Sequence, residues 1–265
     1  MLAKLMKYEL KATGRVFLPL YIALLVLAII NRFMVNLPTS WKIPAVISLI
    51  IYAVILVGMF VIALVMTIQR FNKNLLTVEG YLMFTLPVKP WQHIVSKLLV
   101  AMFWVVVSTA ITFISGFIIA YRAKNMAMII KDINTLLLWL SDRWTSSFFV
   151  YFVEFLIGVL VILAAMILLL YASIAIGHLF SRHRILASIA AFIVLNTLTE
   201  ILNAIVTMIA GRFYHGFAFM RTLQFDNHLI IWANILLAAV FGAIFFAISN
   251  RILNRHLNLD RRAIP

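Results

Sequence analysis

Six long apolar runs constrain the fold of this chain more than any other feature of its sequence. They cover residues 16–36, 44–68, 92–121, 148–178, 185–210 and 228–250. Each has at least the roughly 20 residues that a helix needs to cross the hydrocarbon core of a bilayer. Only 11% of the 265 residues are charged, against about 25% in a typical soluble domain. The sequence therefore predicts an all-α, polytopic membrane protein with six transmembrane helices.

Residues 1–15 predict a separate N-terminal helix that lies in the membrane interface before the first span. Apolar and basic side chains recur in this stretch at helical spacing, as in Met6, Leu10, Lys7 and Lys11. No small-residue cleavage site follows the first apolar run, so we expect this start to be retained rather than removed as a signal peptide. No other stretch is long and polar enough for a soluble domain, and residues 1–265 are expected to form one membrane domain.

The segment between the third and fourth spans is too short and too charged to cross a membrane. Its apolar residues fall at helical spacing, and they are Ile129, Ile130, Ile133, Leu136, Leu137 and Leu140. This pattern predicts an amphipathic helix on the outer surface.

Lysine and arginine are distributed unequally between the two sides of the predicted spans. Of the 22 residues, 14 fall in residues 1–15, the 69–97 loop, the turn before residue 185 and the tail, and 8 fall on the other side. Because cytoplasmic loops carry the excess of basic residues, both termini and the 69–97 loop are predicted to be cytoplasmic. The net charge of +14 then reflects basic loops beside an anionic leaflet, and no nucleic-acid partner is expected.

Sequence signatures of an enzyme are not found. The chain has no cysteine, no GxxxxGK[ST] phosphate loop, no HExxH zinc motif and no GxSxG elbow. We therefore expect no catalytic residue, no metal site and no cofactor in this chain.

The longest charged interruption on the predicted cytoplasmic side is Arg70 to Lys97. Thr77 can cap a short helix, and Glu79 in its first turn suits the positive end of the helix dipole. Pro87 ends that helix after about two turns, and Pro90 fits the first turn of the next long helix. The stretch predicts a short, partly apolar helix that is held between two spans and is suited to contact another protein.

The sequence RFNKNLLTVEGYLMFTLPVKPWQHIVSKLL resembles the first cytoplasmic loop of ATP-binding cassette (ABC) permeases of the type-2 exporter class, especially those of Gram-positive bacteria. The tail RILNRHLNLD is similar to the usual ending of that family. The resemblance implies a short cytoplasmic coupling helix that docks on a separate ATPase subunit. The residues it places at that contact are Glu79, Gly80, Tyr81, Leu82, Phe84 and Pro87.

The same resemblance implies the remaining parts of such a transporter. ATP and Mg would bind to the partner ATPase and not to this chain, and a second permease chain, identical or paralogous, would complete the pathway. The membrane would be a bacterial plasma membrane, and the exported substrate would be amphipathic, such as an antimicrobial peptide, an antibiotic or a lipid-like compound.

Polar residues inside the predicted spans allow two interpretations. Asn196, Glu200, Asn203 and Thr207 recur on one face of the fifth span, and Glu154 lies in the fourth. A carboxylate within a span usually faces a bundle interior or a water-filled path, so Glu154, Asn196, Glu200 and Asn203 are candidates for a translocation path. Equally, they can join helices by hydrogen bonds, with Glu200 paired to Arg212 or Arg32.

Polar residues of the third span, by contrast, are predicted to serve close packing. They are Ser108, Thr109, Thr112 and Ser115.

Two other functions remain open from the sequence. The chain could be a non-transporting membrane anchor or immunity partner of a soluble protein. It could also be an ion-coupled secondary transporter that uses Glu154 and Glu200, although no internal repeat or broken helix supports this.

Overall fold

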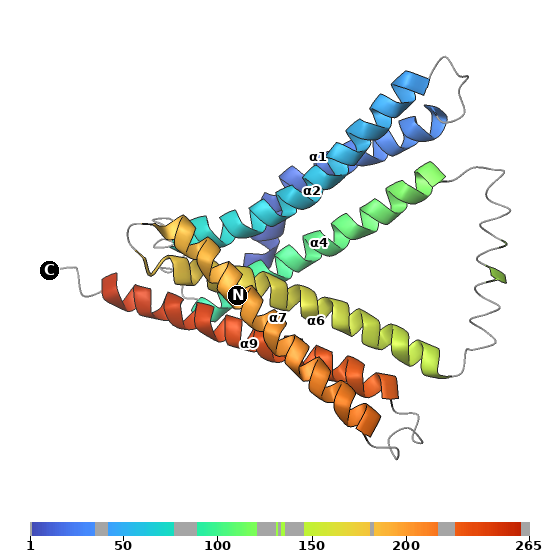
Figure 1. Cartoon of the computed structure of the whole chain (residues 1–265). Coiled ribbons are helices and arrows are strands. Elements are labelled where there is room, and N and C mark those ends of the chain that lie inside the picture. Colours follow the sequence, from blue (N-terminus) through green and yellow to red (C-terminus); the bar gives the residue numbers. More distant parts are fainter. Residues whose placement is uncertain are drawn as a thin grey trace. The chain divides into compact units, whose positions relative to one another are not determined.

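A computed structural model of the chain describes residues 2–34, 42–76, 89–120, 131, 134–135, 146–180, 183–216 and 226–260. The regular secondary structure in these ranges is helical, which confirms the predicted all-α class (Figure 1). The long helices are α1 (Leu2–Met34), α2 (Lys42–Leu76), α4 (Pro90–Ala120), α6 (Ser146–Gly177), α7 (Arg184–Gly216) and α9 (Asp226–Asp260).

All six helices are long and apolar enough to cross a membrane, so the chain is a multi-pass membrane protein. The shortest, α4, has 31 residues and the longest, α2 and α9, have 35. At about 1.5 Å per residue they are roughly 46–53 Å long, against about 30 Å for the hydrocarbon core. In particular, α2 and α9 continue past the predicted ends of their spans at residues 68 and 250.

Of the surface helix predicted between α4 and α6, the structure describes Lys131, Asn134 and Thr135. These residues are helical and exposed, and the Thr135 hydroxyl donates a hydrogen bond to the Lys131 carbonyl oxygen at 2.7 Å. The apolar residues of that segment lie outside the described residues.

Residues 2–15 do not form the helix of their own that the sequence predicted, because α1 is one continuous helix from Leu2 to Met34. Their position in the membrane interface stays a prediction. Figure 1 shows that α1 bends, with its first part inclined to the rest. Pro19 lies inside the helix, and proline removes one backbone hydrogen bond, which permits a bend without ending the helix. The amphipathic pattern also has a different partner from the one predicted, since Met6 and Leu10 pack against the protein's own core.

The helices assemble into two compact units, each built from segments that are separate in the sequence. Unit 1 comprises Met1–Thr67 and Leu99–Phe148, and unit 2 comprises Ile68–Leu98 and Phe149–Pro265. Two helices, α2 and α4, therefore contribute residues to both units.

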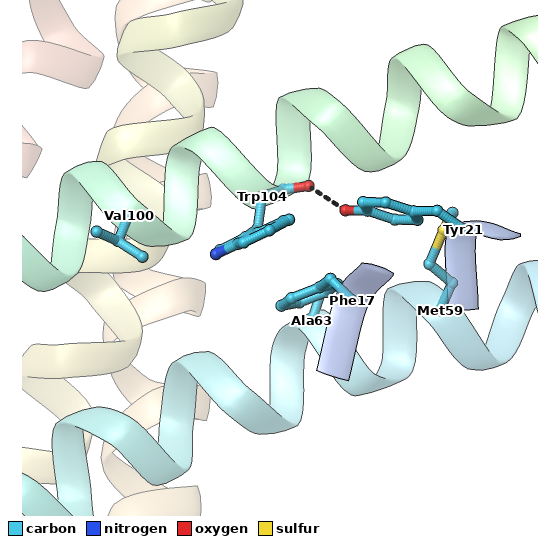
Figure 2. Close-up of a cluster of buried hydrophobic side chains, with 6 residues drawn as sticks. All are labelled: Phe17, Tyr21, Met59, Ala63, Val100 and Trp104. Atoms are coloured by element: carbon cyan, nitrogen blue, oxygen red, sulfur yellow. Dashed lines mark hydrogen bonds between the residues drawn. The ribbon is translucent and has the colours of Figure 1, made fainter. Parts of the chain in front are cut away.

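A cluster of buried side chains from α1, α2 and α4 lies in the core of unit 1 (Figure 2), and we call it the aromatic cluster. Its members are Phe17, Tyr21, Met59, Ala63, Val100 and Trp104. The ring of Phe17 stacks on that of Trp104 with centroids 4.6 Å apart. The indole nitrogen of Trp104 donates a hydrogen bond to the Thr13 hydroxyl at 2.6 Å. Because the indole N–H has a hydrogen-bond acceptor, burial of Trp104 leaves no polar group unsatisfied at this position.

Two tyrosine–serine pairs continue this core along α4. The hydroxyls of Tyr21 and Ser108 are 2.9 Å apart, and those of Tyr52 and Ser115 are 2.8 Å apart. Both serines are fully buried, which confirms the prediction that they are packing residues. Thr112 is half-buried, and the same prediction is wrong for Thr109, which is exposed and donates its hydroxyl to the Val105 carbonyl oxygen of its own helix. The pairs also show direction: α1 and α4 run parallel, since Phe17 meets Trp104 and Tyr21 meets Ser108 further along both helices.

In unit 2, α6 and α9 run parallel and approach closely. The indole nitrogen of Trp232 on α9 donates a hydrogen bond to Glu154 on α6 at 2.8 Å. Further along both helices, a methyl group added at Gly242 would lie 3.6 Å from Ala165. Small residues at such contacts let helix backbones pack closely in membranes.

The turn between α6 and α7 is tight. A methyl group added at Gly177, the last residue of α6, would lie 2.7 Å from the Ser188 nitrogen and 2.8 Å from the Arg184 carbonyl oxygen. Glycine therefore permits the first turns of α7 to lie directly against the end of α6. Beyond this turn α7 packs against α9.

Candidate functional site

The residues predicted to dock on an ATPase lie outside the described residues. They are Glu79, Gly80, Tyr81, Leu82, Phe84 and Pro87. What the structure describes is the pair of helix ends that carry them, Ile68–Leu76 of α2 and Pro90–Leu98 of α4, which we call the loop base. The helix α4 begins at Pro90, as the sequence predicted. Both parts of the loop base belong to unit 2.

An aromatic contact joins the loop base to α6. Phe71 and Tyr171 stack with centroids 4.1 Å apart and planes 8° from parallel, and both side chains are almost completely buried. Offset-stacked aromatic pairs contribute about 0.5–1.5 kcal/mol beyond the burial of their area. The contact also places the last turns of α2 beside the last turns of α6.

The first turns of α4 bury one apolar and three polar side chains. Ile94 is completely buried, and His93, Ser96 and Lys97 are 2%, 1% and 4% exposed. Lys97 was expected among the loop charges, and the structure instead buries it in the loop base. The hydroxyl of Ser96 and the side-chain oxygen of Asn72 on α2 have no hydrogen-bond partner among the described residues. Buried polar groups are nearly always hydrogen-bonded. We therefore interpret the loop base as a candidate region for contact with a further segment or with another protein.

Glu154 and Glu200, the two carboxylates of the predicted path, lie in different surroundings. Glu154 is 3% exposed and accepts the hydrogen bond from Trp232, so its environment is that of a contact between α6 and α9. Glu200 is exposed on α7, as is Asn196, and Asn203 is half-buried. Asn196, Glu200 and Asn203 thus lie on one helix, α7, and Glu154 lies on another, α6. The side chain of Arg212, a predicted partner of Glu200, lies outside the described side chains.

Two features of unit 2 were missed from the sequence. Trp232 was not recognised as the partner of Glu154, and Tyr171 was not recognised as the partner of Phe71. A buried carboxylate in a span does signal that a hydrogen-bond donor must lie nearby. The identity of the donor depends on which helices pack together, and apolar spans carry little information on that point.

Neither a protein-family model, nor a curated protein, nor a solved structure matches this chain. The fold and the site therefore define a class, a multi-pass membrane protein with six candidate spans.

Proposed function

We propose that the chain is the membrane-spanning permease subunit of an ABC exporter, with residues 79–87 as the segment that contacts a separate ATPase subunit. The proposal rests on the resemblance of the Arg70–Lys97 sequence to a coupling loop. The observation that carries it in the structure is the stack of Phe71 on Tyr171. A segment that transmits force requires a rigid attachment, and the loop base is attached to α6 by this buried contact.

In this proposal, movement of the ATPase pushes on residues 79–87 and is passed on by the loop base. The α2 end would act on α6 through Tyr171, and the α4 end would act through the buried side chains around Ile94. ATP and Mg bind to the partner subunit, and this chain supplies the mechanical connection.

Asn196, Glu200 and Asn203 are the proposed lining of the path, because they lie on one face of α7 and are exposed or half-buried. We assign Glu154 to helix packing, since it is buried against Trp232. A carboxylate in the path favours a cationic or amphipathic substrate, such as a peptide, an antibiotic or a lipid-like compound. Exchange of Glu200 for glutamine should then reduce transport most for cationic substrates.

The proposed location is a bacterial plasma membrane with both termini in the cytoplasm. Since the chain has no cysteine, single cysteines at Thr77, Thr135 and Ser181 can test this orientation. An impermeant thiol reagent applied to intact cells should label the Thr135→Cys variant alone. Labelling of Thr77→Cys in intact cells would contradict the orientation.

The test of the proposal is co-purification of the tagged chain from native membranes, followed by an ATPase assay of the complex. The double variant Tyr81→Ala with Phe84→Ala should insert normally but lose the ATPase, because aromatic anchors at interfaces typically contribute about 2 kcal/mol or more, roughly a thirtyfold change in affinity. The matched control is Ile30→Ala with Phe33→Ala, an exposed pair with the same spacing in the last turns of α1, which should retain the complex.

Three outcomes separate the candidate functions. A complex whose ATPase responds to substrate, and which the first double variant abolishes, supports the exporter. A complex without substrate-dependent hydrolysis points to a membrane anchor. Transport by the reconstituted chain alone, driven by an ion gradient, points to a secondary transporter.

A further inference from the structure

One face of α1 carries exposed cations at the start of the helix and exposed apolar side chains along the rest. The residues of this face follow one another at spacings of three or four positions, which places them on one side of the helix. We call them the outer face of α1, and they are Lys4, Lys7, Lys11, Arg15, Leu18, Ile22, Val26, Ile29 and Phe33. The character of this face changes once, between Arg15 and Leu18, from cationic to apolar.

The opposite side of α1 packs on the protein itself. Phe17 and Leu24 are buried there, and Met6 and Leu10 pack against the aromatic cluster. The apolar side of residues 2–15 is therefore already occupied. What this part of α1 presents outward is its row of cations.

The four cations are not balanced within the described part of the chain. They are exposed, and no ion pair or hydrogen bond joins them to any residue that the structure describes. Like charges three or four positions apart on a helix destabilise it, and Lys4 lies in the first turn of α1, at the positive end of the helix dipole. Among residues 1–15 the sequence has one acidic side chain, Glu9. An anion from outside the chain would therefore stabilise the start of α1.

The apolar half of the outer face indicates which kind of anion fits. Leu18 and Ile22 are 57% and 62% exposed, and an exposed apolar side chain of a span lies against acyl chains. Arg15 precedes Leu18 by one helical turn, so it lies where the acyl chains end and the lipid phosphates begin. Tyr8, which is 70% exposed among the cations, is of a residue type enriched at membrane interfaces. A molecule with an anionic head and acyl chains matches both halves of the face, whereas a soluble anion matches the cations alone.

We propose that the outer face of α1 is a binding site for an anionic phospholipid. Lys11 and Arg15 contact its phosphate, and its acyl chains lie along Leu18 and Ile22. Arginine can donate two parallel hydrogen bonds to a phosphate, and lysine adds a compact charge. The two earlier lysines of the face raise the positive potential that attracts such a lipid. The start of α1 is on the predicted cytoplasmic side, whose leaflet carries the anionic lipids.

This inference goes beyond the proposed function and does not depend on it, since the site involves neither an ATPase nor a transported substrate. It also differs from the interfacial helix expected from the sequence. That helix would bind the membrane by its apolar side, whereas the site proposed here recognises the charge of the lipid.

Quenching of a fluorophore by brominated lipid measures which lipid occupies the outer face. Because the chain has no cysteine, Ile22→Cys can carry a single bimane label. The labelled protein is reconstituted in phosphatidylcholine vesicles that contain rising fractions of phosphatidylglycerol brominated on its acyl chains, or of phosphatidylcholine with the same bromination. A basic residue beside an anionic lipid contributes roughly a fivefold preference. We therefore expect half-maximal quenching at a fraction of brominated phosphatidylglycerol about fivefold lower, or less, than that of brominated phosphatidylcholine.

Two perturbations test whether the cations cause this preference. Lys11→Gln with Arg15→Gln should remove most of it. The matched control, Lys42→Gln with Arg251→Gln, removes the same charge from an exposed lysine and an exposed arginine of other helices and should keep it. In 1 M salt, where charges are screened beyond about 3 Å, the preference should also fall without any substitution of a basic residue.

Equal quenching by the two brominated lipids in the protein that carries the label alone would overturn the proposal. A preference that the Lys11 and Arg15 double variant retains would overturn it too, as would one that the control loses equally or that salt leaves unchanged. Absence of quenching by either lipid would also overturn it and would show that protein covers this face of α1.

Discussion

Replacement of Gly177 by alanine should destabilise the protein, whereas the same replacement at Gly116 should not. At Gly177 the added methyl group would lie 2.7 Å and 2.8 Å from two backbone atoms of α7. Backbone cannot rotate away as a side chain can, so the ends of α6 and α7 must separate. Overpacking of this kind typically costs about 1–3 kcal/mol. At Gly116 nothing lies within 4 Å of the added methyl, and alanine is favoured over glycine in a helix by about 1 kcal/mol.

The two variants should therefore differ in free energy of unfolding by about 2–4 kcal/mol. Equilibrium unfolding in mixed micelles, followed by tryptophan fluorescence, measures this difference. The two variants are matched, because the same glycine-to-alanine change is made at both positions. The double variant Gly177→Ala with Ser188→Ala should regain little of the lost unfolding free energy, because the clash with the backbone nitrogen of residue 188 remains. Equal stability of the Gly177 and Gly116 variants would refute the close approach of the two helices.

Substitutions at three further contacts test the packing within the two units by the same unfolding measurement. Phe71→Ala should cost about 3–5 kcal/mol, as truncation of a buried aromatic side chain usually does, and Phe71→Leu should cost clearly less; equal losses would argue against the stack. A double-mutant cycle of Tyr21→Phe and Ser108→Ala should give a coupling of about 0.6 kcal/mol, typical of hydrogen bonds between membrane helices, and purely additive effects would argue against the bond. Glu154→Gln should keep an acceptor for Trp232, whereas Glu154→Leu should lose about 1 kcal/mol of unfolding free energy, the net contribution of one hydrogen bond, because it removes the acceptor of the Trp232 N–H; the reverse order would contradict the assignment of Glu154 to packing.

The six spans were predictable from the sequence because a bilayer imposes a simple rule. A backbone in lipid must satisfy its own hydrogen bonds, so an apolar run of sufficient length has to be a helix. The start of α4 was also predictable, since Pro90 fits the first position of a helix. The continuity of α1 was not, because its first residues are basic and amphipathic, and a proline at position 19 can either end a helix or bend it.

Contacts between the helices were harder to predict from the sequence than the spans themselves. Lipid is as apolar as leucine, so the packed and lipid-facing sides of a span share one composition and hydropathy does not separate them. The serines of α4 were recognised as packing residues because small polar side chains within a span let a neighbouring helix approach closely and form a hydrogen bond with them. Their partners, Tyr21 and Tyr52, are 87 and 63 residues distant, and nothing in the local sequence links them.

The division into two units bears directly on how a partner at residues 79–87 could affect the membrane domain. The loop base belongs to unit 2, yet α2 and α4 continue without interruption into unit 1. In unit 1 both helices are held by the aromatic cluster, through Met59 and Trp104. Each of the two helices therefore has buried residues in both units: Met59 and Phe71 on α2, and Ile94 and Trp104 on α4. On the proposed function, a force applied at residues 79–87 would act first on these two helices.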